Sequence, residues 1–115
     1  MKYMLMIYEN EAVYEQPGAM EAIIGEHMAL SQQLGATITG GGGLMPTATA
    51  TTVRKQNGVQ TLHDGPFAET KEQFGGFYVV DVPDLDAALE IARKVPVSQD
   101  GSIEVRPLIG MDEPA

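Results

Sequence analysis

The sequence predicts an α+β fold with a ferredoxin-like βαββαβ order, an added hairpin and an antiparallel sheet. Two nearly continuous apolar runs, residues 2–8 and 77–82, have the composition of central strands. A helical repeat of apolar residues follows each run, and Asn57-Gly58 between them has the signature of a tight hairpin turn. Strands and helices in this order match a split βαβ arrangement.

The first third of the chain contains one strand and one helix. Residues 2–8 carry apolar and aromatic side chains without alternation, as expected for a strand that is covered on both faces. From Met20 to Leu34 the apolar residues recur at helical spacing, and Gly35 supplies a stop. We therefore predict a central strand followed by one amphipathic helix.

The middle of the chain is predicted to hold a short strand and a hairpin. Residues 36–43 run as a strand into a cluster of four glycines. Residues 51–55 and 59–62 can pair around Asn57-Gly58, because these two residues accept the positive φ angles of a primed turn.

The last third repeats the pattern of the first. Residues 77–82 form the second candidate central strand, and a helix is predicted from Asp84 to Val95. Residues 102–108 then alternate between apolar and polar side chains, and Pro107 is better tolerated at the edge of a sheet than in its middle. This last segment is predicted to be an edge strand.

The composition indicates a single cytoplasmic domain that spans residues 1–115. With 115 residues, 43% of them hydrophobic, the chain can build a core without disulfides or metal. It has no cysteine, which excludes thiolate chemistry and favours a reducing compartment. The N-terminal apolar run is too short for a signal peptide or a membrane span, so we expect no membrane partner.

The charge of the chain argues against a nucleic-acid partner. Sixteen acidic and seven basic residues give a net charge of −9, which repels a phosphate backbone. The charge also has a simpler interpretation, namely solubility of a small protein.

The predicted architecture suggests a homodimer. Two helices can cover only one face of the sheet, so the apolar residues of the other face need a second cover. We expect a second copy to supply it by sheet-to-sheet packing. The alternative is a monomer with a modestly apolar open face.

Neither a metal nor an organic cofactor is expected. His27 and His63 form no metal-ligand motif with each other or with a nearby carboxylate. The glycine cluster 40–43 is followed by Leu44, Met45 and Pro46 instead of the helix that a phosphate cradle needs. Its remaining interpretations are a closely approached backbone segment or the wall of a pocket.

His27 and Asp64 are the two candidate catalytic residues. His27 lies on the predicted helix face that points to the sheet, where burial and a neighbouring carboxylate would tune its pKa for proton transfer. Its other interpretation is a hydrogen-bonded core histidine. Asp64 begins an Asp-Gly-Pro turn that either projects the carboxylate into a cleft or only shapes the chain. His63 points to the opposite side from Asp64 and is not selected.

The motif that starts at Asp64 resembles a known family signature. Residues 64–78, DGPFAETKEQFGGFY, are similar to the signature of YCII-related, DGPF-containing proteins, and the similarity extends to residues 1–8, 41–44, 49–54 and 101–107. The resemblance implies a dimeric α/β barrel with a cleft that contains an aspartate and, in the YCII branch, a histidine. Asp64 matches the aspartate position, and His27 lies in the corresponding first helix.

The resemblance also suggests kinds of function. A characterised relative is similar to a dehydrochlorinase that acts on a chlorinated hydroxyquinol, and neighbouring barrels include muconolactone isomerases and small monooxygenases. We expect a cofactor-independent lyase, isomerase or dehalogenase in which an Asp64–His27 pair moves a proton on a small cyclic substrate, with Phe67 and Tyr78 as apolar wall. The alternative is a non-catalytic ligand-binding or regulatory dimer, associated with sigma-factor signalling.

Overall fold

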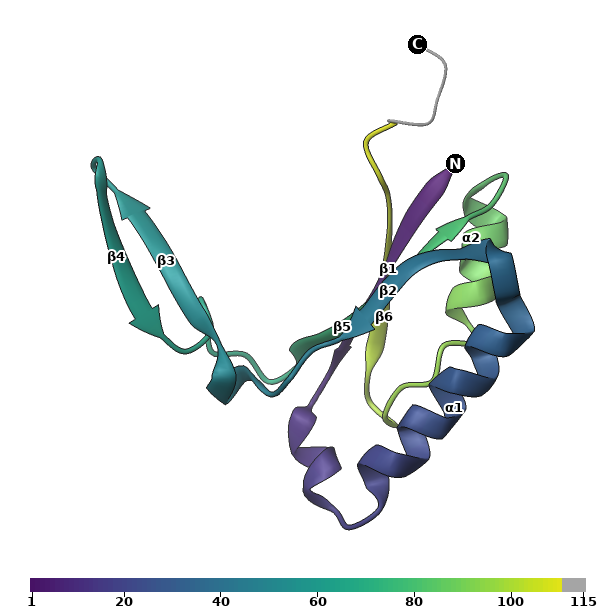
Figure 1. The fold of residues 1–115 in the computed structure, drawn as a ribbon, viewed down its shortest axis with the longest axis horizontal. Coiled ribbons are helices and arrows are strands. Elements are labelled where there is room, and N and C mark those ends of the chain that lie inside the picture. Colours follow the sequence, from purple (N-terminus) through teal and green to yellow (C-terminus); the bar gives the residue numbers. More distant parts are fainter. Residues whose placement is uncertain (111–115) are drawn as a thin grey trace.

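The computed structural model describes residues 1–110 and contains one four-stranded sheet, two helices and a separate hairpin (Figure 1). All strand pairs are antiparallel. The main elements, in chain order, are β1 (Lys2–Glu9), α1 (Ala19–Leu34), β2 (Ile38–Gly43), β3 (Thr51–Gln56), β4 (Val59–Asp64), β5 (Gln73–Asp81), α2 (Leu85–Ala92) and β6 (Ser102–Pro107).

The sheet confirms the predicted ferredoxin-like topology. Its strand order is β2-β5-β1-β6, so the two strands with continuous apolar runs, β1 and β5, are the central ones. The alternating strand β6, which contains Pro107, lies at an edge. Both helices lie on the same side of the sheet (Figure 1). The last five residues of the predicted domain, 111–115, lie outside the described residues.

The core lies between the helices and one face of the sheet. On β1, Tyr3, Leu5 and Ile7 are buried toward the helices, and they pack with Leu30 of α1 and Ile91 of α2. The side chains between them on β1 are only half-buried, so burial along the strand alternates. The prediction that β1 is covered on both faces is therefore met on one face only within this chain.

The hairpin of β3 and β4 forms around the predicted turn. Asn57 has a φ angle of 52° and Gly58 one of 78°, as a primed turn requires. Val53 pairs with Leu62 in the register, and nearly every hairpin side chain is exposed. The hairpin projects away from the main sheet and its helices (Figure 1).

Element boundaries differ most from the prediction at β5 and α2. Strand β5 begins at Gln73, before the predicted Phe77, because Phe74 pairs with Tyr8 across a bulge and extends the ladder. Helix α2 ends at Ala92, three residues earlier than predicted, although its N-cap Asp84 accepts the expected bond from the Ala87 amide. No helix within residues 1–110 is long and apolar enough to cross a membrane.

Candidate functional site

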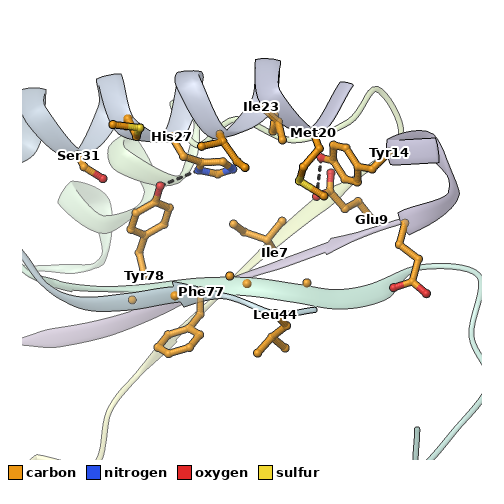
Figure 2. A pocket seen from close by; sticks show the side chains of 18 of the residues that line it. Ile7, Glu9, Tyr14, Met20, Ile23, His27, Ser31, Leu44, Phe77 and Tyr78 are labelled. Atoms are coloured by element: carbon orange, nitrogen blue, oxygen red, sulfur yellow. Dashed lines mark hydrogen bonds between the residues drawn. The ribbon is translucent and has the colours of Figure 1, made fainter. Parts of the chain in front are cut away.

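A pocket of about 660 Å³ lies between α1 and the sheet, a size suited to a small organic ligand. Helix α1 supplies one wall, and the glycines of β2 together with side chains of β1 and β5 supply the other (Figure 2). Its apolar lining includes Ile7, Met20, Ile23, Ile24 and Met28. Such a lining offers mainly apolar contacts, so the few polar groups in it can orient a ligand.

The glycine cluster keeps the pocket open. Gly40 to Gly43 all line the pocket, which confirms the pocket-wall interpretation of this cluster. At Gly41 a Cβ atom would lie 2.8 Å from the carbonyl oxygen of Phe77, closer than real side chains approach. The absence of side chains thus permits both the close strand pairing and the empty space above it.

His27 and Tyr78 form the hydrogen-bonded pair of the pocket. The Nδ1 atom of His27, from α1, lies 2.6 Å from the hydroxyl of Tyr78, from β5 (Figure 2). His27 is half-buried and Tyr78 is buried. A phenol hydroxyl both donates and accepts, so it satisfies either tautomer of a neutral imidazole.

Burial sets the protonation states of this pair. It lowers the pKa of His27 below its ordinary value, an effect that the negative charges of Glu9 and Glu26 oppose. It raises the pKa of Tyr78, and a hydrogen bond with Ser31 opposes that shift. At neutral pH the pocket therefore holds an uncharged imidazole against a protonated phenol.

Glu9 and Tyr14 form a second polar group in the pocket. Glu9, at the end of β1, is only 8% exposed and lines the pocket together with Tyr14, which lies in the short 3-10 helix η1 (Glu11–Glu15). The Tyr14 hydroxyl donates to Glu9 Oε1 at 2.8 Å, and the Ser98 amide donates to Glu9 Oε2 at 2.8 Å. Desolvation and the bond to Glu9 raise the pKa of Tyr14, which keeps its proton.

Glu11, another lining residue, is anchored by hydrogen bonds of both its carboxylate and its amide. Its carboxylate accepts hydrogen bonds from the amide and hydroxyl of Thr47, beyond the end of β2, and its amide donates to Gln73 Oε1 at 2.9 Å. Glu11 and Gln73 both line the pocket. The bonds hold η1 against the connection between β2 and β3 and against the start of β5.

Two of the four predicted site residues meet in this pocket and two lie elsewhere. His27 and Tyr78 line it, whereas Asp64 and Phe67 are exposed and are not among its lining residues. Asp64 ends β4 at the base of the hairpin, and the Phe67 side chain is 76% exposed. The Asp64–His27 pair is therefore not formed by the pocket of a single chain.

Hydrogen bonds fasten the Asp-Gly-Pro turn to β3 and the residue before it. The Gly65 amide donates to Ala50 O at 2.8 Å, and the Thr52 hydroxyl donates to Gly65 O at 2.8 Å. Gly65 has a φ angle of 121°, which a residue with a side chain rarely adopts. The turn thus has a definite architectural role at the base of the hairpin.

The pocket is acidic. Among its lining residues are Glu9, Glu11 and His27 but no lysine or arginine. Within residues 1–110, no group of three or more histidine, cysteine, aspartate or glutamate side chains is placed to hold a metal ion.

Glu9 and Tyr14 line the pocket but were not among the residues predicted from the sequence. Glu9 follows Ile7 by two residues, so the period of a strand places it on the same buried face as Ile7 and Leu5. That alternation was the available signal for a carboxylate under α1. Tyr14 lies in a short 3-10 helix that has no periodic pattern, and nothing local in the sequence indicates its contact with Glu9.

The chain is similar to a curated protein sequence and to a solved structure. Over 67 residues the chain is 51% identical to the uncharacterized protein R00369 of Rhizobium meliloti (strain 1021), an alignment that covers 56% of this chain. The chain spans about half the length of that relative, 54%. A solved structure, 5-chloro-2-hydroxyhydroquinone dehydrochlorinase (TftG) from Burkholderia phenoliruptrix AC1100 in complex with 2,5-dihydroxybenzoquinone, aligns with a TM-score of 0.47 and 16% identity, over 95% of this chain and 94% of the other.

The family assignment comes from a match to nearly the whole chain. The model of the YCII-related domain matches residues 1–112, which include the glycine strand, the Asp-Gly-Pro turn and both sides of the pocket. The chain belongs to the YCII-related domain family.

Proposed function

We propose that this protein is a cofactor-independent lyase, isomerase or dehalogenase that moves a proton on a small cyclic substrate. The observation that carries the proposal is the short hydrogen bond between His27 and Tyr78 inside an apolar pocket. A half-buried imidazole that is uncharged at neutral pH can accept a proton from a substrate and return it to another atom.

The pair can serve both directions of proton transfer. When the Tyr78 hydroxyl donates to Nδ1, the Nε2 atom of His27 carries the ring proton and can only donate a hydrogen bond to the substrate; the acid of the reaction is the imidazolium that forms once Nε2 has taken up a proton. When Nδ1 carries the proton and donates to the Tyr78 oxygen, Nε2 has a free lone pair and can act as a base. Tyr78 thus orients the imidazole in either state, in addition to the wall role predicted for it.

Asp64 enters this proposal as a carboxylate that orients His27 or takes up the proton. Since Asp64 lies outside the pocket of its own chain, a second copy or a movement of the hairpin has to bring it there. The exposed Phe67, three residues further on, would come to the same place and complete the apolar wall.

A homodimer is part of the same proposal. The face of the sheet turned away from the helices carries half-buried Met4 and Met6 on β1 and half-buried Phe77 and Val79 on β5. Covering such a face with the same face of a second copy removes this apolar area from water. A two-stranded hairpin is also marginal in water without a partner surface, which favours contacts of β3 and β4 with that copy.

The test of the reaction is a turnover screen over chlorinated and hydroxylated aromatics and lactones with matched variants. We expect His27→Ala to lower turnover by about 100-fold or more, the usual contribution of a positioned acid or base. Tyr78→Phe and Asp64→Asn should each lower turnover by a smaller factor. The control is Glu90→Gln, because Glu90 lies exposed on α2, away from the hairpin, and does not line the pocket. Turnover that survives both His27→Ala and Asp64→Asn would remove the mechanism.

A second candidate function, a non-catalytic ligand-binding or regulatory dimer, is favoured by the turn at Gly65. Its hydrogen bonds to Ala50 and Thr52 give the Asp-Gly-Pro segment a structural role that does not require Asp64 to be catalytic. In that case a ligand bound in the pocket would survive prolonged incubation unchanged, as mass spectrometry would show.

A further inference from the structure

Glu9 is a buried carboxylate in the pocket that the proposed proton transfer does not use. It is 8% exposed, and Figure 2 shows it beside Tyr14 and Met20, toward the opposite end of the view from His27 and Tyr78. A carboxylate is kept in so apolar a place only with hydrogen bonds, and here the Tyr14 hydroxyl and the Ser98 amide supply one to each oxygen.

The hydrogen bonds of Glu9 leave only acceptors free at this end of the pocket. Each carboxylate oxygen can accept two bonds and has used one. The Tyr14 hydroxyl already donates its hydrogen bond to Glu9, so toward a ligand its oxygen can act only as an acceptor. A ligand atom that reaches Glu9 and Tyr14 can therefore be satisfied only if it donates a hydrogen bond.

The charges around the pocket act in the same direction. Glu9 and Glu11 both line the pocket, and no lysine or arginine lines any part of it. An anionic group of a ligand would face two carboxylates in a partly desolvated space, with no cation to compensate it. An uncharged donor meets no such repulsion.

We propose that the Glu9–Tyr14 end of the pocket selects the substrate class: an uncharged ligand that donates a hydrogen bond, such as a ring hydroxyl, to Glu9, with carboxylated analogues excluded. This inference rests on the proposed function in taking the pocket as the substrate site. Glu9 is then a specificity-determining residue, and the ligand spans the pocket with one polar group at Glu9 and another at the His27–Tyr78 pair.

The test measures equilibrium binding to the full chain by calorimetry with three ring compounds of the same core. Hydroquinone, para-methoxyphenol and para-hydroxybenzoate share one phenol group and differ at the opposite carbon, which carries a donor, an acceptor or an anion. We expect para-methoxyphenol to bind roughly threefold to tenfold more weakly than hydroquinone, and para-hydroxybenzoate more weakly by about tenfold or more, because their opposite groups leave Glu9 unsatisfied or repelled.

Two variants locate the effect at Glu9. Glu9→Gln removes the charge and adds an N–H donor, so para-hydroxybenzoate should recover most of its loss relative to hydroquinone. The matched control is Glu90→Gln, which makes the same chemical change on exposed α2, outside the pocket, and should leave the order unchanged. Tyr14→Phe keeps the carboxylate and should keep the rejection of para-hydroxybenzoate.

The outcomes separate this inference from the reaction itself. If the wild-type protein binds para-hydroxybenzoate as tightly as hydroquinone, or binds none of the three at millimolar concentration, the ligand class is wrong. If the expected order is found while His27→Ala leaves every turnover unchanged, the proposed reaction fails and the ligand class stands. If turnover depends on His27 but the protein binds the three compounds equally well, the proposed ligand class fails and the proposed reaction stands.

Discussion

The surroundings of His27 act on its pKa in opposite directions. Desolvation between α1 and the sheet disfavours the imidazolium, while Glu9 and Glu26 favour it, and desolvation is the larger effect. The bond to Tyr78 fixes the ring orientation without adding charge. A histidine in this balance stays uncharged at neutral pH and can still be protonated by a modest change in its surroundings.

The first prediction concerns the protonation of this residue. His27 should titrate below the ordinary 6.5, so that the folded protein takes up this proton at a lower pH than the unfolded chain does. Well above pH 6.5 the residue therefore has no effect on stability. As the pH falls from 6.5 toward the lower pKa of the folded state, the protein loses stability, since the unfolded state binds more protons over that range. The imidazole resonance followed by NMR against pH gives the midpoint. A midpoint at or above 6.5 would show that burial does not dominate.

At the scale of elements, β2 shows which features follow from the local sequence and which from the packing of strands. The four glycines had two local interpretations, a close approach or a pocket wall, and the structure shows both because β2 pairs with β5 directly beneath the cavity. Central strands, edge strand and the Asn57-Gly58 hairpin were predictable, since each depends on a local pattern or turn geometry. After Ala92 the chain tightens into i→i+3 bonds, from the Lys94 amide to Ile91 O and from the Val95 amide to Ala92 O, and helical periodicity alone does not predict this change.

The second prediction tests the glycine strand with a matched pair of substitutions. Gly41→Ala should destabilise the protein by about 1–3 kcal/mol, because the new Cβ atom would lie 2.8 Å from Phe77 O and the strands would have to separate. Gly43→Ala is the control, since no atom lies within 4 Å of its Cβ position. Urea unfolding followed by circular dichroism measures both changes. Equal loss in the two variants would mean that the close approach at Gly41 is not what requires glycine.

At the scale of the molecule, the hairpin that carries Asp64 lies apart from the pocket. Its principal extents are 46 × 41 × 20 Å, and the hairpin projects from the rest of the fold (Figure 1). The family signature gave Asp64, and helical spacing gave His27, but a contact between them depends on how the hairpin is partnered. On the face of the sheet turned away from the helices, Met6 and Phe77 are only half-buried within the described residues.

The last prediction asks whether assembly brings Asp64 to His27. A carboxylate near an imidazole raises its pKa, so Asp64→Asn should lower the NMR midpoint of His27 if the two residues meet. Within one chain the acidic neighbours of His27 are Glu9 and Glu26, which makes any such shift a sign of contact through a second copy or a moved hairpin. Light scattering on the same samples gives their oligomeric state.

How the shift of the His27 midpoint depends on protein concentration distinguishes contact through a second copy from movement of the hairpin. A shift that is present in the dimer and disappears on dilution to the monomer places Asp64 of one copy in the pocket of the other. A shift that persists in the monomer assigns the contact to hairpin movement within one chain. If Asp64→Asn leaves the His27 midpoint unchanged in a dimer, the dyad is excluded, and the Asp-Gly-Pro turn retains only its bonds to Ala50 and Thr52. A stable monomer at micromolar concentration would in addition overturn the homodimer.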